Sequence, residues 1–169
     1  MSLNIRTSTL DDASSIYQLY RTVAALPGGI ARLEHEVSID YINDFLTKAA
    51  SRGLSLVAEQ DGNVVGEIHA YSPGLFCFAH IWSDLTIAVP PNQQGQGTGR
   101  TLFEALMHEI KEDTRIKRVE LIARESNERA ILFYESLGFI KEGYFNRRIQ
   151  NLDGTFEADI PMAWQRPPA

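Results

Sequence analysis

The chain has 169 residues, of which 44% are hydrophobic, and this is enough to fill the core of one domain. Its formal net charge is −6, and no Lys/Arg-rich run is present, which argues against a general binder of nucleic acid. The one cysteine, Cys77, excludes an internal disulfide, and no Cys/His spacing is typical of a zinc site. We therefore expect a protein of a reducing compartment without a structural metal.

No targeting or membrane segment is expected. The first residues lack a charged region followed by an apolar stretch, and no apolar run is long enough to span a bilayer. We therefore expect a cytoplasmic protein without a membrane partner, folded as a single domain over residues 1–169.

The first half of the chain predicts a strand, two helices and a hairpin. We expect a strand over 3–7, then a helix that begins at a capping box formed by Thr9 and Asp12 and ends by residue 27. A second helix begins at the cap Ser38 and runs to residue 50. The β-rich runs 55–59 and 63–71 predict a hairpin, because the Asp-Gly pair between them tolerates the positive φ of a tight turn.

The second half predicts four more extended segments and two helices. An extended run over 80–89 ends at two prolines, and apolar residues at helical spacing follow the glycines of 95–99. A strand over 118–123, a helix over 127–137 and a final pair of strands over 139–149 and 155–163 complete the chain. The order is βααβββαβαββ without a repeat or linker, so we expect an α/β fold of the mixed, α+β type on one sheet.

The segment Gln94-Gly95-Gln96-Gly97-Thr98-Gly99 is a candidate phosphate-binding loop. Alternate glycines between a strand and a helix let backbone N–H groups turn toward an anion, and the helix N-terminus favours negative charge. An ordinary loop would also explain the glycines. A dinucleotide fingerprint would need glycine or alanine where Arg100 stands, and a P-loop would need Gly-Lys-Ser/Thr, which is absent.

Two motifs resemble those of the GNAT family of N-acetyltransferases. Gln94-x-x-Gly97-x-Gly99 resembles the family's Gln/Arg-x-x-Gly-x-Gly/Ala motif, which binds the pyrophosphate of acetyl-CoA. The stretch 127–139 is similar to the Asn-x-x-Ala-x-x-x-Tyr-x-x-x-Gly-Phe signature of the same family. The resemblance extends through the element order over nearly the whole chain. It implies a central, mostly antiparallel, twisted mixed sheet flanked by helices.

The resemblance implies a set of acetyl-CoA-binding residues. In the family, the strand before the glycine loop splays from the next strand and offers backbone groups to the pantetheine. The expected contacts are Ile87, Ala88, Val89, Gln94, Gly95, Gln96, Gly97, Thr98, Gly99, Arg100, Asn127 and Tyr134.

The spacing of Asn127 and Tyr134 supports their part in this set. Seven residues separate them, so they share one face of a helix and lie about 10 Å apart along its axis. That span suits an extended pantetheine arm. The alternative is a helix cap at Asn127 and an amphipathic core residue at Tyr134.

Acetyl transfer to an amine needs an acid for the leaving thiolate and a base for the ammonium group. A phenol pKa near 10 lies above a thiol pKa near 8.5, so Tyr134 is the expected general acid. Strand alternation places Val65, Glu67, His69 and Tyr71 on one face, and His80, Trp82, Asp84 and Thr86 on one face of the next strand. Glu67 and Asp84 are therefore candidate bases, directly or through water, with a structural hydrogen bond as the alternative for each.

The acceptor site is less defined by the sequence. Loops over 26–36 and 72–79 are expected to form its walls, with Glu34 and Glu67 as candidate ligands of a cationic acceptor. A solvated charge cluster at 34–36 is the alternative. Cys77 is expected to be a small buried hydrophobe rather than a nucleophile. The stretch 151–163 looks like the last hairpin of relatives that acetylate ribosomal-protein N-termini or polyamines.

These observations predict an acetyl-CoA-dependent N-acetyltransferase that acts without a metal. The acceptor is a primary amine of a small molecule, a polyamine-like compound or a peptide N-terminus, which attacks directly in a ternary complex. The alternatives are a non-catalytic acyl-CoA sensor and a binder of another nucleotide phosphate. Analogy with relatives suggests a homodimer.

Overall fold

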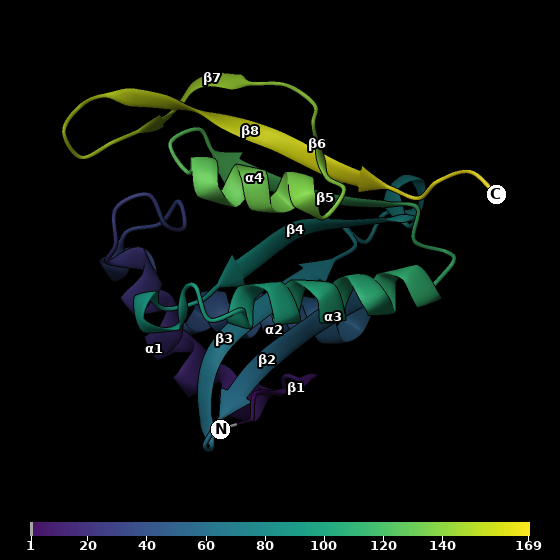
Figure 1. The fold of residues 1–169 in the computed structure, drawn as a ribbon, viewed down its shortest axis with the longest axis horizontal. Helices are drawn as coiled ribbons and strands as arrows, with labels where there is room; N and C mark the ends of the chain where they lie inside the picture. The colour runs from purple at the N-terminus through teal and green to yellow at the C-terminus, as the bar shows by residue number, and fades with distance from the viewer. Residues whose placement is uncertain (1) are drawn as a thin grey trace.

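One eight-stranded sheet organises residues 2–169, which are the residues described by the computed structural model (Figure 1). The strand order is β1-β2-β3-β4-β5-β8-β6, and β7 pairs with β8. Every pairing is antiparallel except that of β4 with β5, which confirms the mixed, mostly antiparallel sheet. The strands are β1 Asn4–Thr7, β2 Gly53–Gln60, β3 Asn63–Tyr71, β4 Ile81–Ala88, β5 Arg118–Arg124, β6 Ile140–Lys141, β7 Phe145–Gln150 and β8 Phe156–Gln165.

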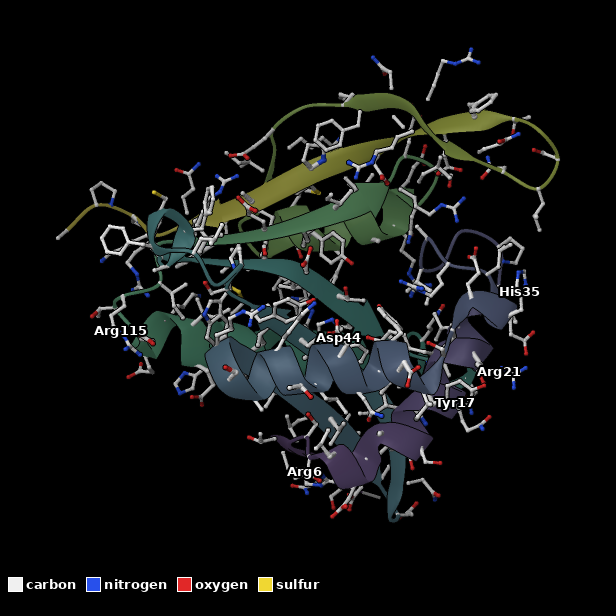
Figure 2. The ribbon with its side chains drawn as sticks, turned by 180° about the vertical axis from the view of Figure 1, so that it is seen from behind. Arg6, Tyr17, Arg21, His35, Asp44 and Arg115 are labelled. Atoms are coloured by element: carbon white, nitrogen blue, oxygen red, sulfur yellow. The ribbon has the colours of Figure 1, made fainter. Side chains whose placement is uncertain are left out.

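Helices cover both faces of the sheet. Helices α3 and α4 lie in front of it in Figure 1, and α2 crosses the front of the reverse view in Figure 2. Each face has its own core: Ile68, Leu106 and Phe139 belong to the core on the side of α3 and α4, whereas Tyr20 and Phe45 belong to the core on the side of α1 and α2. The helices are α1 Ala13–Ala24, α2 Ile39–Arg52, α3 Thr98–Glu112 and α4 Glu128–Ser136, with short 3₁₀ turns at Leu10–Asp12, Glu34–Glu36, Phe76–Phe78 and Pro91–Gln93.

The local signals for the first helices and the hairpin are confirmed. The Ser38 hydroxyl accepts the N–H of Tyr41 at 3.1 Å and so caps α2. The turn between β2 and β3 has φ of 52° at Asp61 and 78° at Gly62, which is the left-handed conformation that an Asp-Gly pair tolerates.

The prediction of one continuous strand over 139–149 is wrong. It is divided into the two-residue β6 and the longer β7, and the chain leaves the sheet between them. Gly143 lies in this break with φ of 156°, a conformation that side chains rarely adopt. The second strand of the pair, β8, extends two residues beyond the predicted end.

Two β-bulges break the predicted strand alternation. In β3, Glu67 and His69 are buried on the side of α1 and α2, but Val65 packs on the α3 side. The pairing register skips Val65, because Gly66 pairs with Ala58 and the next pair joins residues 64 and 59. The shared face predicted for Val65 is therefore wrong.

The second bulge is in β4. Ser83 pairs with Tyr71 and Thr86 pairs with His69, so two residues of β4 lie opposite one residue of β3. Asp84 sits in the bulge with φ of 53°. The face predicted to be common to His80, Trp82, Asp84 and Thr86 is not continuous.

Candidate active site

Strands β4 and β5 part soon after they meet. They pair in parallel only at Ile81 with Arg118 and at Trp82 with Val119. A pocket of about 610 Å³ lies beyond this short ladder. Its walls include residues 85–87 of β4, residues 122–124 of β5, the glycine loop, α4 and the α1–α2 loop. The splayed strands expected from the family resemblance are present.

The glycine loop turns into α3 at one end of the pocket. Gly97 is the N-cap of α3 with φ of 85°, and Gly95 has φ of 78°, so both occupy the region that favours glycine. After Gly97, Thr101 is the first residue whose N–H bonds back into the turn, to the Gly97 carbonyl at 2.9 Å. Among residues 2–169, the N–H groups of Gly95 and of 97–100 donate no hydrogen bond. This geometry provides a group of backbone donors suited to an anion.

The carboxamide of Gln93 holds this loop against the hairpin. Its Nε2 donates to Gln60 Oε1 at 3.3 Å, and its Oε1 accepts the Thr98 hydroxyl at 3.2 Å. Gln94 lines the pocket and its Nε2 donates to the Val89 carbonyl at 3.4 Å. Sequence reasoning included Gln94 and missed Gln93.

Helix α4 contributes Asn127 and Tyr134 to the pocket wall. The Asn127 side chain accepts the Ala130 N–H at 3.3 Å, so it caps α4 as well as facing the pocket. The Tyr134 ring packs against Phe103 and Phe133, each with 5.7 Å between ring centroids. Its hydroxyl has no hydrogen-bond partner within residues 2–169. Burial raises the pKa of Tyr134 to about 12.

The candidate base Glu67 is enclosed behind the sheet and does not line the pocket. Its carboxylate accepts the Tyr20 hydroxyl at 2.5 Å and the Ser55 hydroxyl at 2.8 Å. His69 Nδ1 lies 3.1 Å from both carboxylate oxygens, and the His69 ring stacks on Phe45 with 3.9 Å between centroids. Burial and the Glu67 carboxylate raise the pKa of Tyr20 well above its usual value. The structure therefore shows the alternative stated for Glu67, in which its carboxylate makes structural hydrogen bonds.

The other predicted acceptor-side groups are also outside the pocket lining. Asp84 is exposed at the β4 bulge, and Glu34 pairs with Arg21 at 2.7 Å. The α1–α2 loop contributes residues 29–32 to the lining, as expected, but 72–79 adjoins a second cavity beside Trp82. The prediction of a buried Cys77 is wrong: Cys77 is exposed in the short turn that projects from this second region.

Several pocket residues were missed by sequence reasoning. Besides the expected Arg100, three arginines line it, from the α1–α2 loop, β5 and the first turn of α4: Arg32, Arg124 and Arg129. The Arg32 guanidinium lies 3.9 Å above the ring of Tyr41, which also lines the pocket. Asp159 of β8 is the one carboxylate in the lining formed by the described residues. Only the final contact of β5 with β8 brings Arg124 and Asp159 there, and no local pattern encodes that pairing.

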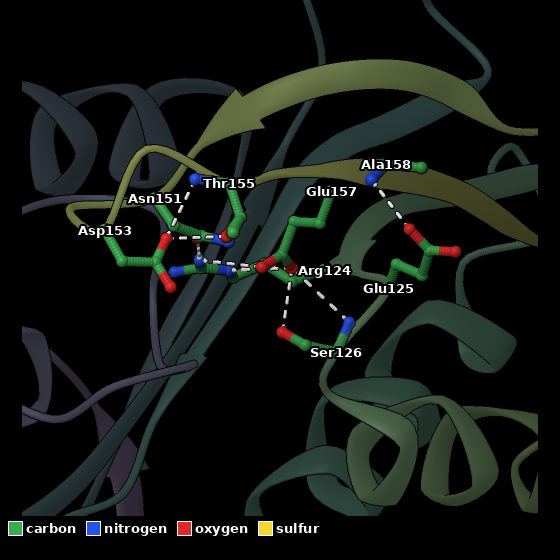
Figure 3. A network of polar contacts seen from close by, with 8 residues as sticks. All are labelled: Arg124, Glu125, Ser126, Asn151, Asp153, Thr155, Glu157 and Ala158. Atoms are coloured by element: carbon green, nitrogen blue, oxygen red, sulfur yellow. Dashed lines mark hydrogen bonds and ion pairs between the residues drawn. The ribbon is translucent and has the colours of Figure 1, made fainter.

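A polar network fixes the edge of this wall (Figure 3). Arg124 Nη2 donates to Glu157 Oε2 at 3.2 Å and to Asn151 Oδ1 at 2.7 Å. Glu157 also accepts the Ser126 hydroxyl at 2.8 Å, next to the cap of α4. Arg124 lowers the pKa of Glu157 to about 2. The network therefore joins β5, β8 and the start of α4.

Comparison with known proteins agrees with this architecture. Residues 14–139 match the sequence model of the Acetyltransferase (GNAT) family. The chain belongs to the GNAT family. This confirms the family resemblance predicted from the two motifs. Within residues 2–169, no helix is long and apolar enough to cross a membrane, and no His/Cys/Asp/Glu group suits a metal.

Individual GNAT relatives match over different lengths. The [Ribosomal protein bS18]-alanine N-acetyltransferase of Escherichia coli strain K12 is 44% identical over 74 residues, which are 44% of this chain and 49% of that enzyme. The chain thus spans about half the length of the curated relatives it matches. A ribosomal-protein-alanine N-acetyltransferase structure from Brucella melitensis has a TM-score of 0.83 at 25% identity, covering 96% of this chain and 99% of that chain.

Two further GNAT structures contain acetyl-CoA. The structure of yncA from Salmonella typhimurium with its cofactor acetyl-CoA has a TM-score of 0.87 at 20% identity, covering 100% of this chain and 96% of that one. A phosphinothricin acetyltransferase from Sinorhizobium meliloti in complex with AcCoA has a TM-score of 0.84 at 18% identity, covering 100% and 94%. Both share the fold of this chain and hold the co-substrate expected from its sequence.

Proposed function

We propose that this chain transfers the acetyl group of acetyl-CoA to a primary amine by direct attack in a ternary complex. One observation carries the proposal: the pocket opened by the parted strands has backbone N–H donors at one end and a phenol on its wall. Within residues 2–169, none of these groups has a hydrogen-bond partner. Such a site suits a long ligand with a diphosphate at one end and a thioester farther along.

The residues present fit acetyl-CoA. The N–H groups between Gln94 and Arg100 would bind the diphosphate, with Arg100 and Arg129 adding positive charge at the rim of the pocket. The backbone of residues 87–89, of which Ile87 and Val89 line the pocket, would bind the amide groups of the arm. The Asn127 side chain lies beside this path at the start of α4.

The chemistry requires protonation of the departing sulfur. The Tyr134 phenol is held by aromatic packing and keeps its proton at neutral pH, because burial raises its pKa. Tyr134 would donate this proton as the carbon–sulfur bond breaks. Its hydroxyl has no competing acceptor among residues 2–169, which leaves the proton available.

The acceptor is proposed as a primary amine of a small molecule, a polyamine-like compound or a peptide N-terminus. Similarity to enzymes named for alanine of a ribosomal protein supports the peptide N-terminus as one member of this set. The α1–α2 loop and β8 form the part of the wall available to the acceptor, beyond the glycine loop and α4.

Thiol release tests the proposal. The protein is incubated with acetyl-CoA and a panel of amines, and free thiol is followed for the native chain and Tyr134→Phe. Loss of the general acid should lower kcat by about 100-fold or more without a change in acetyl-CoA affinity. Tyr144→Phe is the matched control, because Tyr144 is 52% exposed and outside the pocket lining. Full activity of Tyr134→Phe at saturating substrate across pH would refute the acid role.

The rival functions give different results in the same assays. A non-catalytic acyl-CoA sensor would bind CoA but release no thiol with any amine of the panel. A binder of another nucleotide would be stabilised more by ATP or NAD than by CoA in a thermal-shift measurement. The phenol of Tyr134 facing the pocket favours the enzyme over the sensor.

A further inference from the structure

Asp159 of β8 stands apart from the other acidic groups of the chain. Within residues 2–169, it is the one carboxylate that lines the pocket. The pocket otherwise carries four arginines, so the charge on its wall is mostly positive. An amine acceptor arrives at neutral pH as a cation, and a single carboxylate in such a wall defines one place where that cation is favoured.

The neighbouring acids are engaged elsewhere. Glu67 accepts two hydroxyl groups behind the sheet and is fully buried. Glu157 lies two residues before Asp159, but Arg124 and Ser126 occupy its oxygens. Asp84 and Glu34 lie outside the pocket lining. None of them combines a pocket position with an available carboxylate.

Neighbouring strands fix the position of Asp159, but the ion pair that it makes does not fully neutralise the charge of its carboxylate. It pairs across the sheet with Arg124 of β5 and with Phe145 of β7. Its side chain is 14% exposed, and its one ion pair among the described residues is with Arg148 Nε of β7 at 3.4 Å, a side chain that is 51% exposed. An exposed partner at this distance contributes little to binding the carboxylate.

The charged groups around Asp159 come from three strands. Arg148 and Arg124 favour its ionised form, whereas Glu157 opposes it. Burial is the largest effect and raises the pKa of Asp159 above its usual value. A carboxylate made more basic in this way is better suited to accept a proton.

Resting on the proposed function, we propose that Asp159 binds the ammonium group of the acceptor in the pocket and removes its proton. The site takes a primary ammonium ion, and Asp159 replaces Glu67 and Asp84 as the catalytic base. At pH 7, only about one molecule in a few thousand of such an amine is neutral, so a positioned base has a large effect.

The proposed reaction combines proton transfers with the replacement of the carbon–sulfur bond by a carbon–nitrogen bond. The ammonium gives one proton to the Asp159 carboxylate, and the neutral nitrogen forms a bond to the thioester carbonyl carbon. The carbon–sulfur bond breaks and its electron pair stays on sulfur, which takes the Tyr134 proton. The second nitrogen proton passes to the Tyr134 phenolate, and Asp159 later releases its proton to solvent. The products are the amide, CoA thiol and one proton.

Steady-state kinetics of Asp159→Asn test this role. The panel is spermidine, glycinamide, L-methionine and an alanine-first hexapeptide. At pH 7, kcat/KM of the best acceptor should fall by about 100-fold or more. The rate of the variant should then rise about tenfold per pH unit toward the acceptor pKa, while the native rate levels off. A structural defect would not produce this slope. Asp159→Glu should recover part of the activity.

Asp61→Asn is the matched control. Asp61 is exposed in the β2–β3 turn, and asparagine tolerates its positive φ, so neither kinetics nor acetyl-CoA affinity should change. An Asp159→Asn variant within threefold of the native chain at pH 7 would overturn the proposal. So would a loss of activity matched by an equal loss of acetyl-CoA affinity.

A binding measurement separates this inference from the proposed function. Calorimetry with CoA present gives the affinity of each panel amine for the native chain and for Asp159→Asn. Weaker amine binding by tenfold or more in the variant would support the ammonium site, even if the native chain released no thiol and the transferase proposal failed. Equal affinity of both proteins, or no amine binding by either, would overturn the inference.

Discussion

Tyr134 is partly buried and Glu67 is fully buried, and the two side chains differ in whether a hydrogen-bonding atom is left unused. Aromatic rings surround the Tyr134 ring while its hydroxyl has no partner in residues 2–169. Two hydroxyl donors occupy the oxygens of Glu67, and His69 lies against them. Burial alone therefore does not identify a catalytic group. The presence of an unused hydrogen-bonding atom that faces the pocket separates the two cases.

A substitution at Glu67 tests its structural role. Glu67→Gln places an amide among donors that need acceptors, so the free energy of unfolding should fall by roughly 1–3 kcal/mol. Because Glu67 is not in the pocket lining, kcat should stay within about threefold of the native value. Urea denaturation and thiol release measure the two effects, with the exposed Glu112→Gln as control. A stable variant with a large loss of kcat would instead restore Glu67 as a candidate base.

At the scale of elements, the glycine loop depends on a backbone conformation as much as on space. A Cβ at Gly95 or Gly97 would meet no atom within 4 Å, yet both residues have positive φ. The constraint is therefore conformational: left-handed backbone is unfavourable by roughly 1–2 kcal/mol for other residues. A shift of this turn would re-aim the N–H groups at the start of α3.

Gly97→Ala tests that constraint. The affinity for CoA should weaken by about tenfold, since relief of the left-handed conformation turns donors away from the diphosphate. Calorimetric titration with CoA measures the change. Gly62→Ala is matched in strain, with φ of 78° in the β2–β3 turn and outside the pocket lining. It should lose stability while keeping CoA affinity; equal affinity losses in both variants would point to a general folding defect.

At the scale of the whole molecule, stability against acid depends on ion pairs that join distant segments. The Arg124–Glu157 pair links β5 to β8, and the side chains are 17% and 10% exposed. The pKa of Glu157 is depressed to about 2, below its unfolded value near 4.3. Its contribution is therefore complete above the unfolded pKa and is lost as the pH falls toward 2.

Glu157→Gln should show this window directly. The variant should unfold at lower urea concentration than the native chain at pH 7, and the difference should shrink steadily between pH 4.3 and pH 2. Urea midpoints at a series of pH values measure it, with Glu112→Gln as the control for loss of an exposed charge. A difference that stayed constant down to pH 2 would contradict the depressed pKa.

Much of the architecture could be predicted because it is encoded locally. The cap at Ser38, the Asp-Gly turn at 61–62 and the spacing of apolar residues in α3 each determine their own element. Gln94, Gly97 and Tyr134 lie in the pocket lining as expected, because they belong to segments with a strong sequence signature. The predicted Ala88, Gln96 and Thr98 are not part of that lining. Their roles toward acetyl-CoA remain predictions.

The parts that could not be predicted depend on pairing between distant strands. The bulges at Val65 and Asp84 follow from register with neighbouring strands, which alternation within one segment does not reveal. Alternation correctly predicted that Glu67 and His69 share one face of the strand, but it could not reveal that α1 and α2 cover that face. Asp159 reaches the pocket only because β8 pairs with β5, more than thirty residues earlier in the chain.

The short parallel ladder between β4 and β5 has a consequence for how a ligand is recognised. After Trp82 and Val119, the facing edges of the two strands no longer serve each other as donors and acceptors. An elongated molecule with amides in a row could pair with those edges as though it were an added strand. Selection for such a molecule would act on chain geometry, so residues along this path could vary widely in side chain while affinity persisted.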